Sequence, residues 1–184
     1  IGVAYGEEIS FTTLAILPTV GTSSVSNVTS FSATISSNVV SDGGATVTER
    51  GVVYSTSSNP TTSNSKIVSG SGLGEFKCTI KSLSYATTYY VRAYAKNSAG
   101  TVYGNKITFT TSPILPTVSA STVTKITSSS ATISSSVTSD GGATVTERGV
   151  VYSTSQNPTT SNSKIVSGSG LGSFTCALSS LSPG

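Results

Sequence analysis

The sequence predicts an all-β protein built from tandem antiparallel β-sandwiches, and three observations support this prediction. Ser and Thr total 69 of 184 residues, and with 19 Val and 11 Ile they favour extended structure, because branched side chains suit a pleated surface. Helix-favouring residues are scarce, with no Met and only eight Leu. Turn-forming Gly, Asn and Asp separate short runs in which apolar and polar residues alternate, which is the pattern of half-buried strands.

An internal repeat defines the domain size. A shift of 98 residues places Ser41–Gly74 on Ser139–Gly172, and within these 34 residues only Ser58 and Gln156 differ. A period of 98 residues is too long for a solenoid and equals one small β-sandwich. The chain is therefore expected to be part of a tandem array.

The first half of the complete period contains two predicted strands. Ser32–Ser36 alternates small apolar and polar residues, which indicates a strand. Ser41–Gly44 indicates a turn, because Gly adopts a positive φ without steric cost. Thr46–Ser55 is the second strand, and Thr56–Ser65 is a polar loop that contains Asn59-Pro60.

The second half continues the same alternation of strands and turns. In order, the sequence predicts an edge strand at Lys66–Ser69, a flexible turn at Gly70–Gly74, strands at Glu75–Lys81 and Thr88–Lys96, a hairpin turn at Asn97–Gly100 and a last strand at Val102–Thr111. Regular turn signals between short strands are typical of a seven-stranded antiparallel sandwich.

The strand Thr88–Lys96 provides the candidate contact surface. Its alternation places Tyr90, Arg92 and Tyr94 on the face opposite Tyr89, and the adjacent strand is expected to add Glu49 or Tyr54. Aromatic rings beside a guanidinium suit a sugar ring or a neighbouring protein. The alternative is cross-strand packing, with an Arg92–Glu49 pair that covers an exposed sheet face.

The two cysteines, Cys78 and Cys176, lie one period apart and are expected to occupy equivalent places in two domains. A disulfide between them is therefore not expected. Alternation points Cys78 inward with Phe76 and Ile80, so it is interpreted as a small buried hydrophobic residue rather than a reactive thiol.

A family resemblance appears in Leu83–Gly100, which resembles the fibronectin type III pattern L-x-P-x-T-x-Y-x-V-x-A-x-A-x-N-x-x-G. Leu181–Gly184 opens the same motif. The resemblance places Tyr89 at the tyrosine corner, where the hydroxyl bonds nearby backbone. The motifs D-G-G-A-T-V-T-x-R-G-V-x-Y-S-T-S-x-N-P and V-R-A-Y-A-x-N resemble immunoglobulin-like repeats of surface proteins from Bacteroidota-type bacteria. The tryptophan that fibronectin type III domains usually have on the second strand is missing, and Ile35 lies near its place. The turn at Asn97–Gly100 reads NSAG, so it lacks the integrin-binding tripeptide of some animal domains.

The composition argues against catalysis, metal binding, nucleic-acid binding and a membrane span. The chain has no His, which excludes Ser-His and Cys-His catalysis and most zinc sites. Its seven acidic residues are too dispersed for a catalytic pair, and Asp42 is interpreted as a turn residue rather than a calcium ligand. Ten scattered Lys and Arg argue against nucleic-acid binding, and no apolar stretch is long enough for a membrane span. We expect no enzyme activity, cofactor or metal.

The repeat also predicts three segments. Residues 1–16 align with Ala99 onward and correspond to the last strand of a preceding repeat, residues 17–112 form a complete repeat, and residues 113–184 form a second repeat without its last two strands. We expect the chain to be a section of a longer protein. The alternative is a polymer in which a partner's Ile1–Thr13 is added by strand exchange. The linker Thr111–Pro116 contains two prolines, which predicts a semi-rigid rod.

These observations favour an extracellular structural role on a bacterial surface, as a stalk, spacer or fibre body. The expected partners are neighbouring repeats and other copies in a fibre. Alternatives are a weak multivalent module for a glycan or a cell-surface protein, and an accessory domain of a secreted hydrolase or phage fibre.

Overall fold

The computed structural model describes residues 1–183, and all of its regular secondary structure is β-strand. Gly184, the last residue of the predicted second repeat, lies outside this range. The chain divides into two compact units: unit 1 comprises Ile1–Leu83 and Thr88–Thr110, and unit 2 comprises Ser84–Thr87 and Thr111–Gly184. The predicted domain boundaries at residues 17, 112 and 113 remain predictions.

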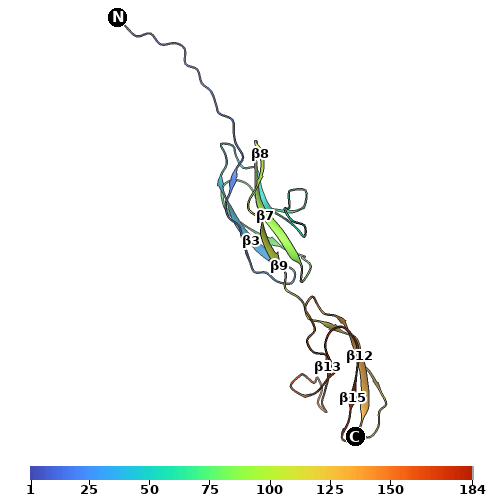
Figure 1. Ribbon diagram of the computed structural model, residues 1–184. Coiled ribbons are helices and arrows are strands. Elements are labelled where there is room, and N and C mark those ends of the chain that lie inside the picture. The colour runs from blue at the N-terminus through green and yellow to red at the C-terminus, as the bar shows by residue number, and fades with distance from the viewer. Residues whose placement is uncertain (184) are drawn as a thin grey trace. The chain divides into compact units, whose positions relative to one another are not determined.

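Unit 1 contains two antiparallel sheets (Figure 1). Its strands are β1 (Thr19–Val20), β2 (Ser24–Ser26), β3 (Ala33–Ser41), β4 (Glu49–Ser55), β5 (Ser65–Val68), β6 (Gly74–Ile80), β7 (Thr88–Asn97), β8 (Gly100–Tyr103) and β9 (Ile107–Thr110). In one sheet β3 pairs with β1 and β2 along one edge and with β6 along the other. In the second sheet the order is β5-β4-β7, and both β8 and β9 pair with β7.

The core of unit 1 lies between these sheets and is built by alternation. Along β3 and β6 every second residue is buried, and Ile35 and Ile80 are fully buried. The facing sheet contributes Val52, Val91 and Ala93, each with no exposed surface. Burial of apolar surface at about 25 cal/mol per Å² is the main stabilising term for such a sandwich. The all-β antiparallel sandwich predicted from the sequence is therefore confirmed.

Several predicted strand bounds were wrong for physical reasons. The predicted strand Val102–Thr111 is divided into β8 and β9, because the pairing changes from Tyr94 opposite Tyr103 to Val91 opposite Ile107, a shift of one residue. Such a shift is a β-bulge, here between Gly104 and Ile107, and bulges bend a strand. The predicted strand Ser32–Ser36 extends to Ser41, and the strand predicted from Thr46 begins at Glu49.

Unit 2 repeats part of this arrangement. Its strands are β10 (Thr117–Val118), β11 (Thr122–Thr124), β12 (Ala131–Ser139), β13 (Gly149–Tyr152), β14 (Ser163–Val166) and β15 (Gly172–Leu178). β12 pairs with β10, β11 and β15, as β3 does with its neighbours in unit 1, and β13 pairs with β14. The main buried cluster is small: Val137, Val145, Phe174 and Cys176.

Residues 1–16, which align with a final strand, are assigned no strand in the structure. The residues of unit 1 that align with this segment form β8 and β9, because they pair with β7. A strand is defined by its ladder of hydrogen bonds, and none of the described residues offers such a ladder to this segment. The alignment of this segment with a final strand remains a sequence-based prediction.

Candidate functional site

The candidate contact surface lies on the outer face of the β5-β4-β7-β8 sheet, which is the face opposite the core. Residues directly opposite in an antiparallel pair share a face. The register pairs Glu49 with Lys96, and Gly51 with Tyr94, so these residues lie on the outer face together. Arg92 and Tyr90 follow on β7 at alternate positions.

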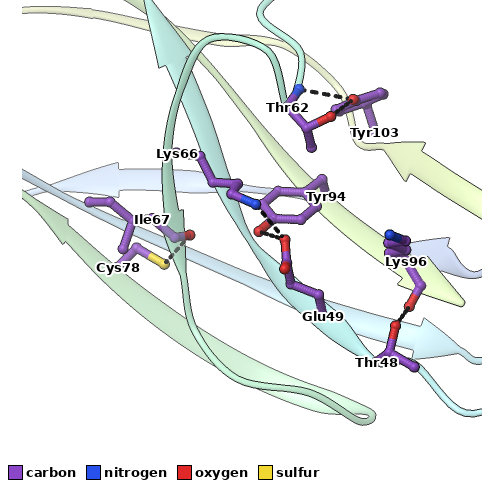
Figure 2. Close-up of polar contacts among 9 residues, drawn as sticks. All are labelled: Thr48, Glu49, Thr62, Lys66, Ile67, Cys78, Tyr94, Lys96 and Tyr103. Atoms are coloured by element: carbon purple, nitrogen blue, oxygen red, sulfur yellow. Dashed lines mark hydrogen bonds and ion pairs between the residues drawn. The ribbon is translucent and has the colours of Figure 1, made fainter.

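Tyr94 is not a surface residue, which corrects the sequence-based expectation. Its side chain has no exposed surface, and Figure 2 shows its hydroxyl directed at Glu49. The hydroxyl donates to Glu49 Oε1 at 2.6 Å, and Lys66 Nζ donates to the same oxygen at 3.0 Å. Lys66 Nζ also lies 6.0 Å from the centroid of the Tyr94 ring. Tyr94 therefore belongs to a packed cluster and cannot contact a ligand in this conformation.

The cluster fixes the protonation of both groups at neutral pH. Burial, followed by the hydrogen bond to Glu49, raises the pKa of Tyr94 well above its usual range. The hydrogen bond from Tyr94, followed by that from Lys66, lowers the pKa of the Glu49 carboxyl. Glu49 is therefore an ionised acceptor and Tyr94 a neutral donor.

Arg92 does not form the predicted pair with Glu49. The register places Arg92 opposite Val53, four residues beyond Glu49. Its Nε donates to the Gly104 carbonyl at 3.1 Å, and its guanidinium lies 4.8 Å from the centroid of the Tyr103 ring. The Gly104 carbonyl and the Tyr103 ring, neither anticipated from the sequence, contact the guanidinium instead.

The remaining rings and cations of the outer face also contact one another. Tyr103 accepts a hydrogen bond from the Thr62 amide at 2.9 Å (Figure 2). Lys106 Nζ lies 5.2 Å from the centroid of the Tyr90 ring and contacts Ser58 at 3.2 Å. Aromatic faces already covered by internal cations offer less to an external ligand. Of the predicted contact residues on this face, Tyr90, Arg92 and Glu49 retain partial exposure.

Tyr54 lies on the other face of the sheet, so it does not join the predicted surface. It pairs with the buried Val91 and packs against the core. Its ring centroid is 6.4 Å from that of Tyr89, which in turn stacks on Phe109 at 5.8 Å. Tyr89 is a buried aromatic residue. Its expected hydroxyl-to-backbone bond remains a prediction.

The two cysteines are free and buried, each about 2% exposed. Cys78 points inward with Phe76 and Ile80, as the alternation predicts. Its sulfur lies 4.0 Å from the Ile67 carbonyl (Figure 2), and Cys176 repeats this contact with Ile165 at 3.8 Å. Burial raises the pKa of the Cys78 thiol, which disfavours the reactive thiolate.

An arginine contact missed by the sequence reasoning holds the glycine-rich turn. Arg50 Nη1 donates to the carbonyls of Gly72, Leu73 and Gly74 at 3.2, 2.5 and 3.0 Å. In unit 2, Arg148 repeats all three contacts with the matching turn. The turn predicted as flexible is therefore anchored. The only sequence signal was the constant spacing between this arginine and the glycines.

A second set of contacts, which we call the linker clasp, comprises Ile16, Asp42, Gly43 and Asn97. The Asn97 side chain is buried, and its Nδ2 donates to the carbonyls of Ile16 and Asp42, both at 2.7 Å. The Ile16 amide donates to the Gly43 carbonyl at 2.9 Å. Asp42 Oδ1 accepts from the Gly44 amide at 2.9 Å, as expected of a turn aspartate.

Unit 2 repeats the backbone hydrogen bond of the linker clasp. The Ile114 amide donates to the Gly141 carbonyl at 2.9 Å, and Asp140 accepts from the Gly142 amide at 2.9 Å. A Cβ on Gly43 would lie 2.2 Å from the Ile16 carbonyl oxygen, and one on Gly141 would lie 2.2 Å from that of Ile114. Glycine is required in both turns because the chain that enters each unit lies directly against it.

Residues 1–183 contain no group of three or more His, Cys, Asp or Glu side chains arranged to hold a metal ion. No helix among the residues described is long and apolar enough to cross a membrane. The contacts on the outer face, the arginine contacts and the linker clasp all join residues of this chain to one another.

The fold that these sheets define is a fibronectin type III/immunoglobulin-like β-sandwich. The chain is similar to the solution structure of the third fibronectin III domain of human KIAA0343 protein, with 19% identity, coverage of 58% of this chain and 93% of that chain, and a TM-score of 0.39. It is also similar to a two-domain fibronectin type III segment from chicken tenascin, with 17% identity, coverage of 91% and 85%, and a TM-score of 0.38. No family model and no curated protein matches the sequence.

Proposed function

We propose that the chain is a structural repeat region of an extracellular bacterial surface or adhesin-like protein, where it serves as a stalk, a spacer or the body of a fibre. The role is mechanical rather than catalytic. A surface rich in hydroxyls, with few charges, and the resemblance to repeats of Bacteroidota-type surface proteins support the extracellular assignment.

The observation that carries this proposal is the linker clasp. Each unit holds the segment that enters it with a backbone hydrogen bond, from Ile16 to Gly43 and from Ile114 to Gly141. In unit 1 the buried Asn97 adds a bond to Ile16. A spacer transmits position along its length only if the junctions resist bending, and a clasped linker loses the torsional freedom that a flexible linker retains.

A matched pair of glycine substitutions tests this role. Gly141→Ala pushes against the Ile114 carbonyl in the segment that enters unit 2, whereas Gly43→Ala makes the same clash at Ile16, which precedes the first strand of unit 1. Residual dipolar couplings of the whole chain report whether the two units share one alignment. We expect Gly141→Ala to separate the alignment tensors of the units and Gly43→Ala to leave them matched. Equal effects of the two variants would argue against a clasped junction.

A second candidate function is weak multivalent binding of a glycan or a protein, and the partial exposure of Tyr90 and Arg92 supports it. Repetition would multiply a weak site without new contacts. Tyr90→Ala combined with Arg92→Ala tests this alternative in a cell-adhesion assay. The structural role predicts unchanged adhesion by a folded variant, and the binding role predicts its loss.

A further inference from the structure

An open cleft lies in unit 1 where β4 ends and β5 begins. It has a volume of about 610 Å³, which is within the usual range of small-molecule sites. Each strand beside it has its partners in the sheet, because β4 is paired with β5 on one edge and with β7 on the other. The residues that line the cleft include Tyr54, Thr56, Ser63, Asn64, Ser65 and Tyr89.

The loop that forms one wall of the cleft is held in place. Pro60 is fully buried, and the Thr62 amide donates to the Tyr103 hydroxyl at 2.9 Å (Figure 2). The Thr61 amide donates to Asn64 Oδ1 at 2.9 Å, and the Asn64 amide donates back to the Thr61 carbonyl at 2.9 Å. This reciprocal pair orients the Asn64 side chain before any ligand arrives, which lowers the entropic cost of binding.

The polar groups of the cleft have unused hydrogen-bonding capacity. Because the bond from Thr61 engages Asn64 Oδ1, the two N–H donors of Asn64 Nδ2 have no partner among residues 1–183. The hydroxyls of Tyr54, Ser63 and Ser65 also make no hydrogen bond to another residue of the described range. Ser63, Asn64 and Ser65 are exposed and Tyr54 is half-buried, so these groups are accessible to a ligand.

Tyr54 gives the cleft one aromatic wall. Its ring centroid lies 6.4 Å from that of Tyr89 with the planes tilted by 59°, and Tyr89 stacks on Phe109 at 5.8 Å. These contacts hold the Tyr54 ring from the core side, while its half-burial leaves part of the ring at the cleft. A rigid ring beside amide and hydroxyl groups suits a pyranose, which has an apolar C–H face and a rim of hydroxyls.

The cleft also selects for charge. None of the residues that line it is acidic or basic, so it offers no opposite charge to an ionic ligand. A ligand that enters it exchanges hydrogen bonds with neutral groups alone. This chemistry favours a neutral polyhydroxy compound over an anionic or a cationic one.

We propose that this cleft binds one pyranose unit of a neutral saccharide. The C–H face of the sugar lies on the Tyr54 ring, a sugar oxygen accepts from Asn64 Nδ2, and the Ser63 and Ser65 hydroxyls bond the remaining sugar hydroxyls. The site is distinct from the outer-face residues Tyr90 and Arg92, and the spacer role does not depend on it.

A saccharide titration of the whole 184-residue chain tests the proposal. Maltose, cellobiose and lactose are added separately to isotope-labelled protein, and amide chemical shifts are followed at Tyr54 and Ser63–Ser65. We expect saturable shifts with at least one disaccharide, with a dissociation constant on the order of 1 mM. Glucose and glucuronic acid are then compared, and the anionic sugar should bind more weakly because the cleft has no cation to pair with it.

Asn64→Ala removes the two free donors and keeps the backbone bond to Thr61. It should weaken saccharide binding by about three- to tenfold, as should Tyr54→Phe, which keeps the ring and removes the hydroxyl. The matched control is Asn162→Ala in unit 2, where Asn162 Oδ1 accepts from the Thr159 amide at 2.8 Å. This variant should leave the titration of the unit 1 signals unchanged.

Three results would overturn the proposal. The first is the absence of saturable shifts at Tyr54 and Ser63–Ser65 with all three disaccharides. The second is an equal effect of Asn64→Ala and Asn162→Ala on the unit 1 signals, or equal affinity for glucose and glucuronic acid. The third is a set of shifts centred on Tyr90 and Arg92, which would assign the sugar to the outer face instead.

Discussion

The Tyr94 hydroxyl donates a 2.6 Å hydrogen bond to Glu49 Oε1 from a side chain with no exposed surface. Replacing Tyr94 with Phe removes this hydrogen bond and keeps the ring. A hydrogen bond to a charged acceptor is worth more than a neutral one, so we expect unit 1 to lose about 1–2 kcal/mol of unfolding free energy. Urea denaturation followed by signals from β4 and β7 measures the loss.

Tyr90→Phe is the matched control for this substitution, because Tyr90 lies on the same strand and face and is partly exposed. It should change the unfolding free energy by less than Tyr94→Phe. Equal losses from the two variants would show that the Tyr94–Glu49 bond does not stabilise unit 1.

Protonation of Glu49 at low pH is expected to lower the free energy of unfolding of unit 1. Its pKa is lowered in the folded state from an ordinary 4.5, first by Tyr94 and then by Lys66. Its stabilising effect is therefore complete above pH 4.5 and is lost as the pH falls through the lowered folded-state pKa. We expect Tyr94→Phe to move the Glu49 pKa back towards its ordinary value in a carbon-detected NMR titration. An unchanged Glu49 titration in that variant contradicts the assignment.

The arginine contact with the glycine-rich turn should depend on shape rather than on charge. Arg50→Lys keeps the positive charge but replaces a planar guanidinium with an ammonium that cannot present the same donors to three carbonyls. We expect a loss of about 1–2 kcal/mol and faster amide exchange at Gly72, whose amide bonds the Val47 carbonyl at 2.9 Å. Arg148→Lys should reproduce the effect in unit 2. Wild-type exchange in either lysine variant would show that charge alone suffices.

The sequence predicts the sandwich well because alternation is a local signal. The inward residues of β6 and β7, including Cys78 and Val91, follow from period-two patterning. The cover over Tyr94 could not be predicted in this way. Alternation correctly places Tyr94 on the outer face, but Lys66 reaches it from β5, and only the tertiary arrangement brings the two together.

Other features depend on single contacts that leave a weak sequence signal. β1 and β2 are only two and three residues long, too short for periodicity to show. The one-residue register shift between Gly104 and Ile107 leaves no signal in a run of strand-favouring residues, and beside it Arg92 bonds the Gly104 carbonyl in place of its predicted partner Glu49. Asn97 resembles an ordinary turn residue, and its bond to Ile16 spans 81 positions of the sequence.

The Ile114 amide bonds the Gly141 carbonyl where the chain enters unit 2, and we propose that this contact lets the chain act as a spacer. Residual dipolar couplings from the wild-type chain in one alignment medium test it most directly. A held segment predicts that couplings from β3, β4 and β7 in unit 1 and from β12 and β15 in unit 2 fit one alignment tensor. Two tensors of clearly different magnitude would show that the units reorient independently, and the spacer account would be wrong.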